Sequence, residues 1–304
     1  MPHEQQSAEP TVPTLATGAP EVVVDIAAQN SEGPLWHEDA QRLYWANIPA
    51  GRLYRYDPER EAHELVYQHD GEIGGYTIQR DGSLVLFCSH GRVLRLIGNQ
   101  TEIIVPEIAK EREGRFNDVI ADPDGRVFCG TMPTADGQAR LYRLDPDGTL
   151  TELFGDIGLS NGFGFSPDLA TFYHTDSNNR LIYRMDYDRA SGELSNREVL
   201  IRTPDDGSVP DGMAVDVDGN IWSARWDGRA IFKYSPAGEL LGQVPFPVRK
   251  VSSVTFGGPA YDVAYATTAG GNARSAGEGM LAGSVFRVDL KTSGRAPFRS
   301  RIGM

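Results

Sequence analysis

Residues 209–222 read Val209-Pro210-Asp211-Gly212-Met213-Ala214-Val215-Asp216-Val217-Asp218-Gly219-Asn220-Ile221-Trp222. This stretch predicts a short apolar strand, a tight turn at Asp218-Gly219 and a second strand that begins at Asn220. Asp211 stands at the head of the first strand, seven residues before the turn aspartate Asp218. The unit is therefore a hairpin whose entry carries a carboxylate.

The same spacing of seven residues recurs in three other places along the chain: Asn161 before Asp168, Asn117 before Asp124, and Glu32 before Asp39. Turn positions at residues 39, 81, 124, 168 and 218 are separated by 42 to 50 residues, and a weaker one follows at residues 260–261. A period of this length is typical of one four-stranded blade of a β-propeller. Each copy also shows apolar and polar residues in alternation, which indicates strands with one wetter face.

The repeats predict an all-β fold, a six-bladed β-propeller with four-stranded antiparallel blades. The sixth copy lacks a fourth strand, and the apolar segment 21–26 can supply it from the other end of the chain. Such a closure would remove two open sheet edges. We therefore expect one propeller domain over residues 21–304, preceded by a disordered leader over residues 1–20.

Composition excludes several classes of protein. The formal net charge of −13 argues against nucleic acid as a partner, because a phosphate backbone requires a basic surface. No apolar run approaches the ~20 residues needed to span a membrane, so no membrane partner is expected. Cys88 and Cys129, the only two cysteines, are too few for a disulfide scaffold. The first 20 residues lack the basic and apolar regions of a signal peptide, which favours a cytoplasmic location.

Equivalent positions on the innermost strands of a propeller form a ring around the central channel. Here the ring would consist of Glu32, Gly74, Asn117, Asn161, Asp211 and either Ser253 or Val254. Two carboxylates and two amides are hard oxygen donors, which suit Ca²⁺, Mg²⁺ or Mn²⁺ better than Zn²⁺. A dication would also remove the repulsion between the carboxylates. The alternative is that Asn161-Gly162 and Asp211-Gly212 are simply turn dipeptides.

Arg115 lies two residues before Asn117 and therefore on the same face of a strand that enters the ring. A cation at this position could hold a hydroxylated or anionic substrate. The alternative is an ordinary ion pair at the rim.

Seven further motifs stand along the chain: Glu32-Gly33-Pro34-Leu35-Trp36, Arg115-Phe116-Asn117-Asp118, Asp122-Pro123-Asp124-Gly125-Arg126, Gly130-Thr131-Met132, Ser160-Asn161-Gly162, Pro210-Asp211-Gly212 and Phe256-Gly257-Gly258. In their residues and their order, from about Val22 to the C-terminus, the chain resembles the regucalcin (senescence marker protein)/gluconolactonase/luciferin-regenerating-enzyme-like family. The resemblance implies a six-bladed propeller that hydrolyses sugar lactones with a divalent cation. It further implies metal ligation by Glu32, Asn161 and Asp211, and substrate contacts from Arg115 and Asn117.

The chain departs from the family pattern at two places. Val119 stands where the family usually has glycine, and residues 133–135 offer no acidic side chain where some members have a substrate-contacting one. These differences bear on the identity of the substrate more than on the metal.

The hypothesis that results is a metal-dependent lactonase that opens an aldonolactone such as glucono-, xylono- or arabinonolactone. One divalent cation, with Ca²⁺ preferred and Zn²⁺, Mg²⁺, Mn²⁺ or Fe²⁺ as alternatives, would polarise the lactone carbonyl, and Asp211 would assist water attack as general base. The partner would be a small-molecule sugar lactone, and the protein a monomer or weak homo-oligomer. Two alternatives remain open: a non-catalytic binding propeller with a structural metal, and an esterase or organophosphate hydrolase on the same fold.

Overall fold

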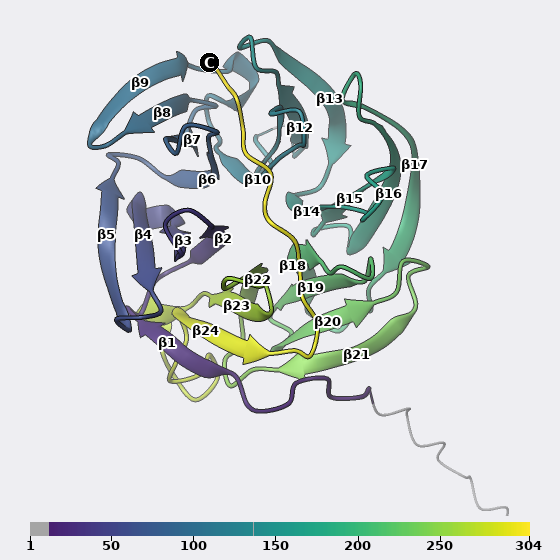
Figure 1. Ribbon diagram of the computed structural model, residues 1–304. Coiled ribbons are helices and arrows are strands. Elements are labelled where there is room, and N and C mark those ends of the chain that lie inside the picture. The colour runs from purple at the N-terminus through teal and green to yellow at the C-terminus, as the bar shows by residue number, and fades with distance from the viewer. Residues whose placement is uncertain (1–11, 136) are drawn as a thin grey trace, which may run out of the picture.

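The protein forms a ring of six four-stranded antiparallel sheets in a computed structural model that describes residues 12–135 and 137–304 (Figure 1). The predicted six-bladed β-propeller is confirmed. In blades 1 to 5 the strands follow one another from the axis outwards, so each blade is a meander of antiparallel hairpins.

The strands of the first three blades, from the innermost outwards, are as follows. Blade 1 contains β2 (Ser31–His37), β3 (Arg42–Asn47), β4 (Arg52–Asp57) and β5 (Ala62–Gln68); blade 2 contains β6 (Ile73–Ile78), β7 (Leu84–Cys88), β8 (Val93–Ile97) and β9 (Gln100–Val105); blade 3 contains β10 (Phe116–Ala121), β11 (Val127–Thr131), β12 (Ala139–Leu144) and β13 (Leu150–Ile157).

The other three blades complete the ring. Blade 4 contains β14 (Ser160–Phe165), β15 (Thr171–Asp176), β16 (Leu181–Asp188) and β17 (Glu193–Arg202); blade 5 contains β18 (Val209–Val215), β19 (Ile221–Trp226), β20 (Ala230–Tyr234) and β21 (Leu240–Pro245); blade 6 contains β22 (Val251–Gly257), β23 (Val263–Thr268), β24 (Ser284–Asp289) and, outermost, β1 (Glu21–Asp25). The predicted closure by the N-terminal segment is therefore confirmed, since β1 pairs with β24.

Three short 3-10 helices, η1 (Ile48–Ala50), η2 (Ala109–Glu111) and η3 (Gly271–Ala273), are the helical segments of the described chain. Within those residues, no helix has the length and apolar character required to cross a bilayer.

Part of the segment expected to be a disordered leader is hydrogen-bonded. Leu15 N donates to Gln243 O at 2.9 Å, and Gln243 N donates to Pro13 O at 2.8 Å, so residues 13–15 run beside β21. Leu15 also packs on the apolar cluster between blades 5 and 6. Residues 1–11 of that leader lie outside the described residues.

The core consists of six apolar clusters, one at each interface between neighbouring blades. Trp36, Trp45 and Trp222 are each 2% exposed or less. They fill the inter-blade space as the alternating pattern requires, because one face of every strand packs against the next blade. This packing fixes the six inner strands around a common axis.

The turn between β18 and β19 uses a buried aspartate, Asp216. The Asp216 carboxylate accepts hydrogen bonds from the backbone N–H of Asp218 and of Asn220, at 3.1 and 2.8 Å. Gly219 has a φ of 86°, a left-handed conformation that favours glycine. The turn predicted at Asp218-Gly219 is thus present, and it determines the register of β18 on β19.

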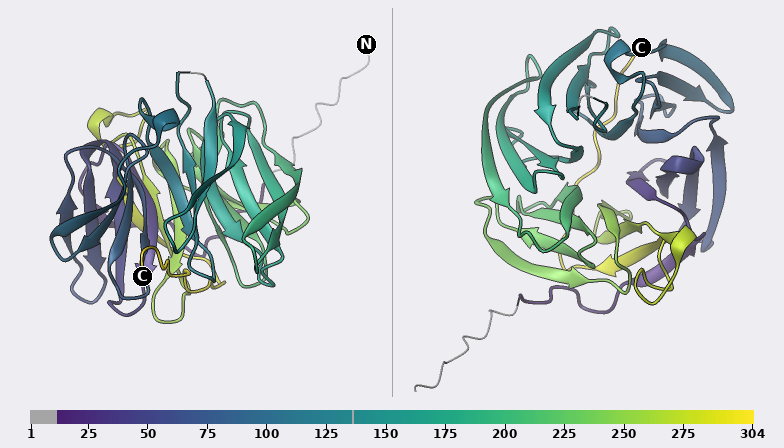
Figure 2. Two further views of the ribbon diagram at one scale, coloured as in Figure 1. Left: turned by 90° about the horizontal axis from the view of Figure 1, so that it is seen from above. Right: turned by 180° about the vertical axis from the view of Figure 1, so that it is seen from behind.

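The C-terminal segment after β24 crosses the face of the ring at which the inner strands end (Figure 1, yellow). Ser300 N donates to Ile78 O at 2.9 Å, and Arg301 N donates to Gly125 O at 2.9 Å. We call this face the base. The opposite face, where the inner strands begin, faces the viewer in the right panel of Figure 2. We call this face the top.

Candidate functional site

The four oxygen-bearing residues predicted to form a ring lie near the starts of β2, β10, β14 and β18, at the top of the channel. Glu32, Asn117, Asn161 and Asp211 are each between 4% and 6% exposed. Each of the six inner strands breaks its pairing with the second strand at this level. Bulges of this kind redirect side chains and are frequent next to active sites.

A chain of hydrogen bonds connects three of the blades within the ring. Arg115 Nη1 donates to Asn117 Oδ1 at 2.7 Å, and Asn117 Nδ2 donates to Asn161 Oδ1 at 2.6 Å. Asn161 Nδ2 then donates to Ser177 Oγ at 2.9 Å, and Ser177 Oγ donates to Pro210 O at 2.6 Å, directly beside Asp211. The structure thus brings Arg115, Asn117 and Asn161 together with the strand that carries Asp211.

Electrostatics link Glu32 to Asp211 across the axis. Burial, followed by the negative charges of Asp211 and Asp118, holds the pKa of Glu32 well above its usual range. Burial and the negative charge of Asp118 likewise hold the pKa of Asp211 well above its usual range. Arg115 lowers both pKa values but does not restore either to its normal range. Three carboxyl groups therefore interact electrostatically with one another and with one cationic side chain.

Asp118 is the functional candidate that sequence reasoning missed. Burial raises the pKa of its carboxyl to about 6, although it accepts a hydrogen bond from the backbone N–H of Gly162. A signal was present, because the residues directly after the other ring positions of blades 1, 2, 4 and 5 are Gly33, Gly75, Gly162 and Gly212. Asp118 is the single charged residue among these five equivalent positions.

The donor set fits a hard divalent cation. Within the described part of the chain, no three Cys, His, Asp or Glu side chains form a metal-binding cluster. Glu32 and Asp211 would therefore require a third ligand of another type, and the candidate on the ring is the Asn161 amide oxygen, which accepts from Asn117 Nδ2 at 2.6 Å. Carboxylate and amide oxygens are typical Ca²⁺ ligands, and a dication would offset the repulsion that raises both carboxyl pKa values.

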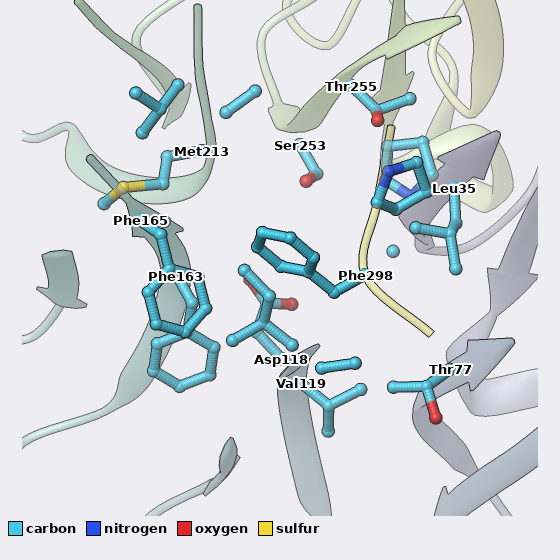
Figure 3. Close-up of a pocket in the computed structure, with 18 of the residues that line it drawn as sticks. Leu35, Thr77, Asp118, Val119, Phe163, Phe165, Met213, Ser253, Thr255 and Phe298 are labelled. Carbon is cyan, nitrogen blue, oxygen red and sulfur yellow. The ribbon is translucent and has the colours of Figure 1, made fainter. Parts of the chain in front are cut away.

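A separate cavity of about 200 Å³ lies lower in the channel (Figure 3). Phe163, Phe165 and Met213 line it, and Phe298 of the C-terminal segment enters it from the base. Asp118 also lines this cavity, so its carboxyl lies between the polar ring and the apolar lower channel. The apolar lining makes the cavity a poor host for a polyhydroxylated molecule, and the ring at the top remains the candidate site.

Comparison with known proteins agrees with this architecture. Residues 30–270 match the family model described as SMP-30/Gluconolactonase/LRE-like region. The chain is 47% identical over 288 residues to pentonolactonase XacC of Haloferax volcanii, covering 92% of this chain and 97% of that protein. It is 34% identical to a 6-deoxy-6-sulfogluconolactonase of Pseudomonas putida, covering 87% of this chain and 92% of that protein.

Among solved structures, a luciferin-regenerating enzyme superimposes with a TM-score of 0.83 at 27% identity, covering 93% of this chain and all of that one. The family resemblance seen in the motifs is thereby confirmed. The chain belongs to the SMP-30/gluconolactonase/LRE-like family.

Proposed function

We propose that the protein hydrolyses a sugar lactone to the free sugar acid at the top of the propeller channel. The observation that carries the proposal is the convergence of Glu32, Asn161 and Asp211 with Arg115 and Asn117 on one buried ring. Relatives named as pentonolactonase and 6-deoxy-6-sulfogluconolactonase support lactones of sugar acids as the substrate class.

Glu32, Asn161 and Asp211 would hold one divalent cation, with Ca²⁺ preferred because all three donors are oxygen. When bound, such a cation supplies Lewis-acid polarisation of the lactone carbonyl. Zn²⁺, Mg²⁺, Mn²⁺ and Fe²⁺ are alternatives that metal analysis of the purified protein would distinguish.

The other roles in the reaction would fall to different side chains at the ring. Arg115 and Asn117 orient ring hydroxyls of the substrate. Asp211 accepts a proton from the attacking water, and the water oxygen bonds to the carbonyl carbon. The bond between that carbon and the ring oxygen then breaks. The ring oxygen is protonated and becomes an alcohol of the product. Ligation of a cation would lower the basicity of the Asp211 carboxylate, so coordination of the water would supply the larger part of its activation.

We also propose that the protein is cytoplasmic and that it is a monomer or weak homo-oligomer, as expected from the sequence. Gel filtration with light scattering would test the oligomeric state.

The test is acidification of weakly buffered xylono- and gluconolactone, with Ca²⁺ and with a chelator. We expect turnover that the chelator abolishes, and loss of turnover in Asp211→Ala with the fold retained. Asp205→Ala is the matched control, since the Asp205 side chain is 77% exposed and pairs with Arg180. Wild-type turnover in Asp211→Ala with metal present would overturn the role of Asp211.

The two other candidates are outcomes of the same experiment. A rate at the spontaneous background, unaffected by the chelator, would favour a binding propeller with a structural metal. Faster turnover of aryl esters or organophosphates than of lactones would favour the esterase alternative.

A further inference from the structure

Glu72 and Arg115 occupy equivalent positions in neighbouring blades. Glu72 lies two residues before the ring position Gly74, and Arg115 lies two residues before the ring position Asn117. The backbone joins the two segments through Ser89, which donates from N to Glu72 O at 3.2 Å and forms an isolated β-bridge with Arg115. The two side chains therefore meet at the rim between blades 2 and 3.

The distance between their charged groups is longer than a hydrogen bond. Arg115 Nε lies 3.7 Å from Glu72 Oε1, whereas N–H···O hydrogen bonds measure about 2.7–3.2 Å. Nη1 of Arg115 is already used, since it donates to Asn117 Oδ1 and to Phe116 O at 2.7 and 2.8 Å. Nε and Nη2 make no hydrogen bond to any of the residues that the structure describes. The two groups thus form an ion pair in which Arg115 Nε and Glu72 Oε1 are not hydrogen-bonded to each other.

The inner strands of blades 2 and 3 approach each other closely beside this pair. Gly74 places no side chain beside Asn117, and none would fit, because a Cβ there would lie 1.9 Å from Phe116 O. The Glu72 side chain is 42% exposed and that of Arg115 is 13% exposed, so the pair extends from the mouth down to the ring. Burial lowers the pKa of Arg115, and among the opposing negative charges that of Glu72 has the largest effect.

The chemistry of this gap matches a hydroxyl group, which accepts one hydrogen bond and donates another. Arg115 would donate to the hydroxyl oxygen, and the hydroxyl proton would be donated to the Glu72 carboxylate. An anionic substituent would be repelled by Glu72, and an apolar one would form no hydrogen bond with either side chain. The equivalent positions in blades 4 and 5 are Leu159 and Val209, which carry no hydrogen-bonding side chain.

We propose that Glu72 and Arg115 form a clamp for one substrate hydroxyl, and that Glu72 is a specificity-determining residue of the lactonase site. This inference rests on the proposed function for its substrate. It assigns to Glu72 the task of distinguishing hydroxylated lactones from lactones without ring hydroxyls.

The experiment compares xylono-1,4-lactone with γ-butyrolactone, which has the same ring size and no hydroxyl, for wild type, Glu72→Ala and Glu72→Gln. A hydrogen bond to a charged group contributes about 1.5–3 kcal/mol, which corresponds to roughly a 10- to 150-fold effect. We expect kcat/KM for xylonolactone to fall by this order in Glu72→Ala, with a smaller loss in Glu72→Gln, while γ-butyrolactone changes less than about threefold. Glu64→Ala is the matched control, because Glu64 is 63% exposed and pairs with Arg55 at 2.7 Å in the outer part of blade 1.

A second measurement separates this inference from the proposed function. The cyclic polyol 1,5-anhydroglucitol carries hydroxyls but no hydrolysable bond, and its binding can be measured by ligand-observed NMR. Weaker binding to Glu72→Ala than to wild type supports the clamp even if no lactone is hydrolysed. Equal losses for both lactones, or unchanged binding of the polyol, would overturn it and reduce Glu72 to an ion-pair partner of Arg115.

Discussion

The amide of Asn117 donates from Nδ2 to Oδ1 of Asn161 across 2.6 Å, and this hydrogen bond joins blade 3 to blade 4 inside the ring. Because Asn117 Oδ1 accepts from Arg115, the orientation of the Asn117 amide is determined. Asn161 is oriented in turn, since its Nδ2 donates to Ser177. One lone pair of Asn161 Oδ1 remains for another partner, because an amide oxygen has two. The ring is thus positioned by contacts within blades 3 and 4 and by the hydrogen bond between them.

Replacement of Asn117 should disturb both of its neighbours. In Asn117→Leu, which has a similar volume, the buried Asn161 oxygen and the Arg115 guanidinium each lose a partner. We expect a loss of roughly 1–3 kcal/mol in the free energy of unfolding and a marked fall in kcat/KM for lactones. Urea denaturation and the lactone assay measure these effects.

The control for that variant is Asn178→Leu, because Asn178 donates only to Gly158 O near the surface, at 2.9 Å. Full activity together with unchanged stability in Asn117→Leu would contradict the oriented chain of amides.

The carboxyl groups of the ring predict how stability depends on pH. The pKa values of Glu32, Asp118 and Asp211 are all raised in the folded protein, that of Asp118 to about 6. The folded state therefore holds more protons than the unfolded chain, so the free energy of unfolding falls as pH rises from about 4 through 6 and above. Asp118 alone should account for roughly 1–3 kcal/mol.

A divalent cation should reverse much of this loss, because it stabilises the charged carboxylates. Denaturation curves between pH 4 and 8, with Ca²⁺ and with a chelator, test the prediction. Asp118→Asn should flatten the metal-free profile. A metal-free stability that increases steadily over this range would show that the three carboxyls are not crowded as described.

Gly74→Ala should be strongly destabilising for a steric reason. The added Cβ would lie 1.9 Å from Phe116 O, which belongs to the backbone of the next blade and has little freedom to move. We expect a loss of at least roughly 1–3 kcal/mol, as for other overpacked sites, measured by thermal and urea denaturation. In Gly277→Ala the nearest contact would be 3.8 Å, so this control should stay within about 0.5 kcal/mol of wild type.

Much of the architecture could be predicted from local signals. The turn aspartates with their regular spacing indicated six blades, and the missing sixth outer strand indicated that residues 21–26 close the ring. The four oxygen-bearing ring residues were predicted from one spacing, since each lies seven residues before a turn aspartate. Asp118 lies one residue beyond the ring position and so outside that spacing, although glycines at the equivalent positions of blades 1, 2, 4 and 5 distinguish it.

Other features have no local signal in the sequence. The bulges at the ring arise when six strands close around an axis, and no turn motif encodes them. The pairing of Glu72 with Arg115 depends on how closely blades 2 and 3 approach. The path of the C-terminal segment likewise depends on partners more than 200 residues away, such as Gln79 and Ile302.

That long-range pairing makes a final prediction. Gln79 is fully buried at the base, where its Nε2 donates to Ile302 O at 2.7 Å and its Oε1 accepts from Ile302 N at 2.9 Å. Gln79→Ala would leave both backbone groups of Ile302 buried without these partners, at a cost of roughly 2–4 kcal/mol for the pair. The segment should then detach, so trypsin should cleave after Arg299 and Arg301 faster than in wild type, as followed by mass spectrometry. Gln100→Ala on the exposed strand β9 is the control, and equal cleavage rates in Gln79→Ala and wild type would mean that Phe298 in the channel suffices to hold the segment in place.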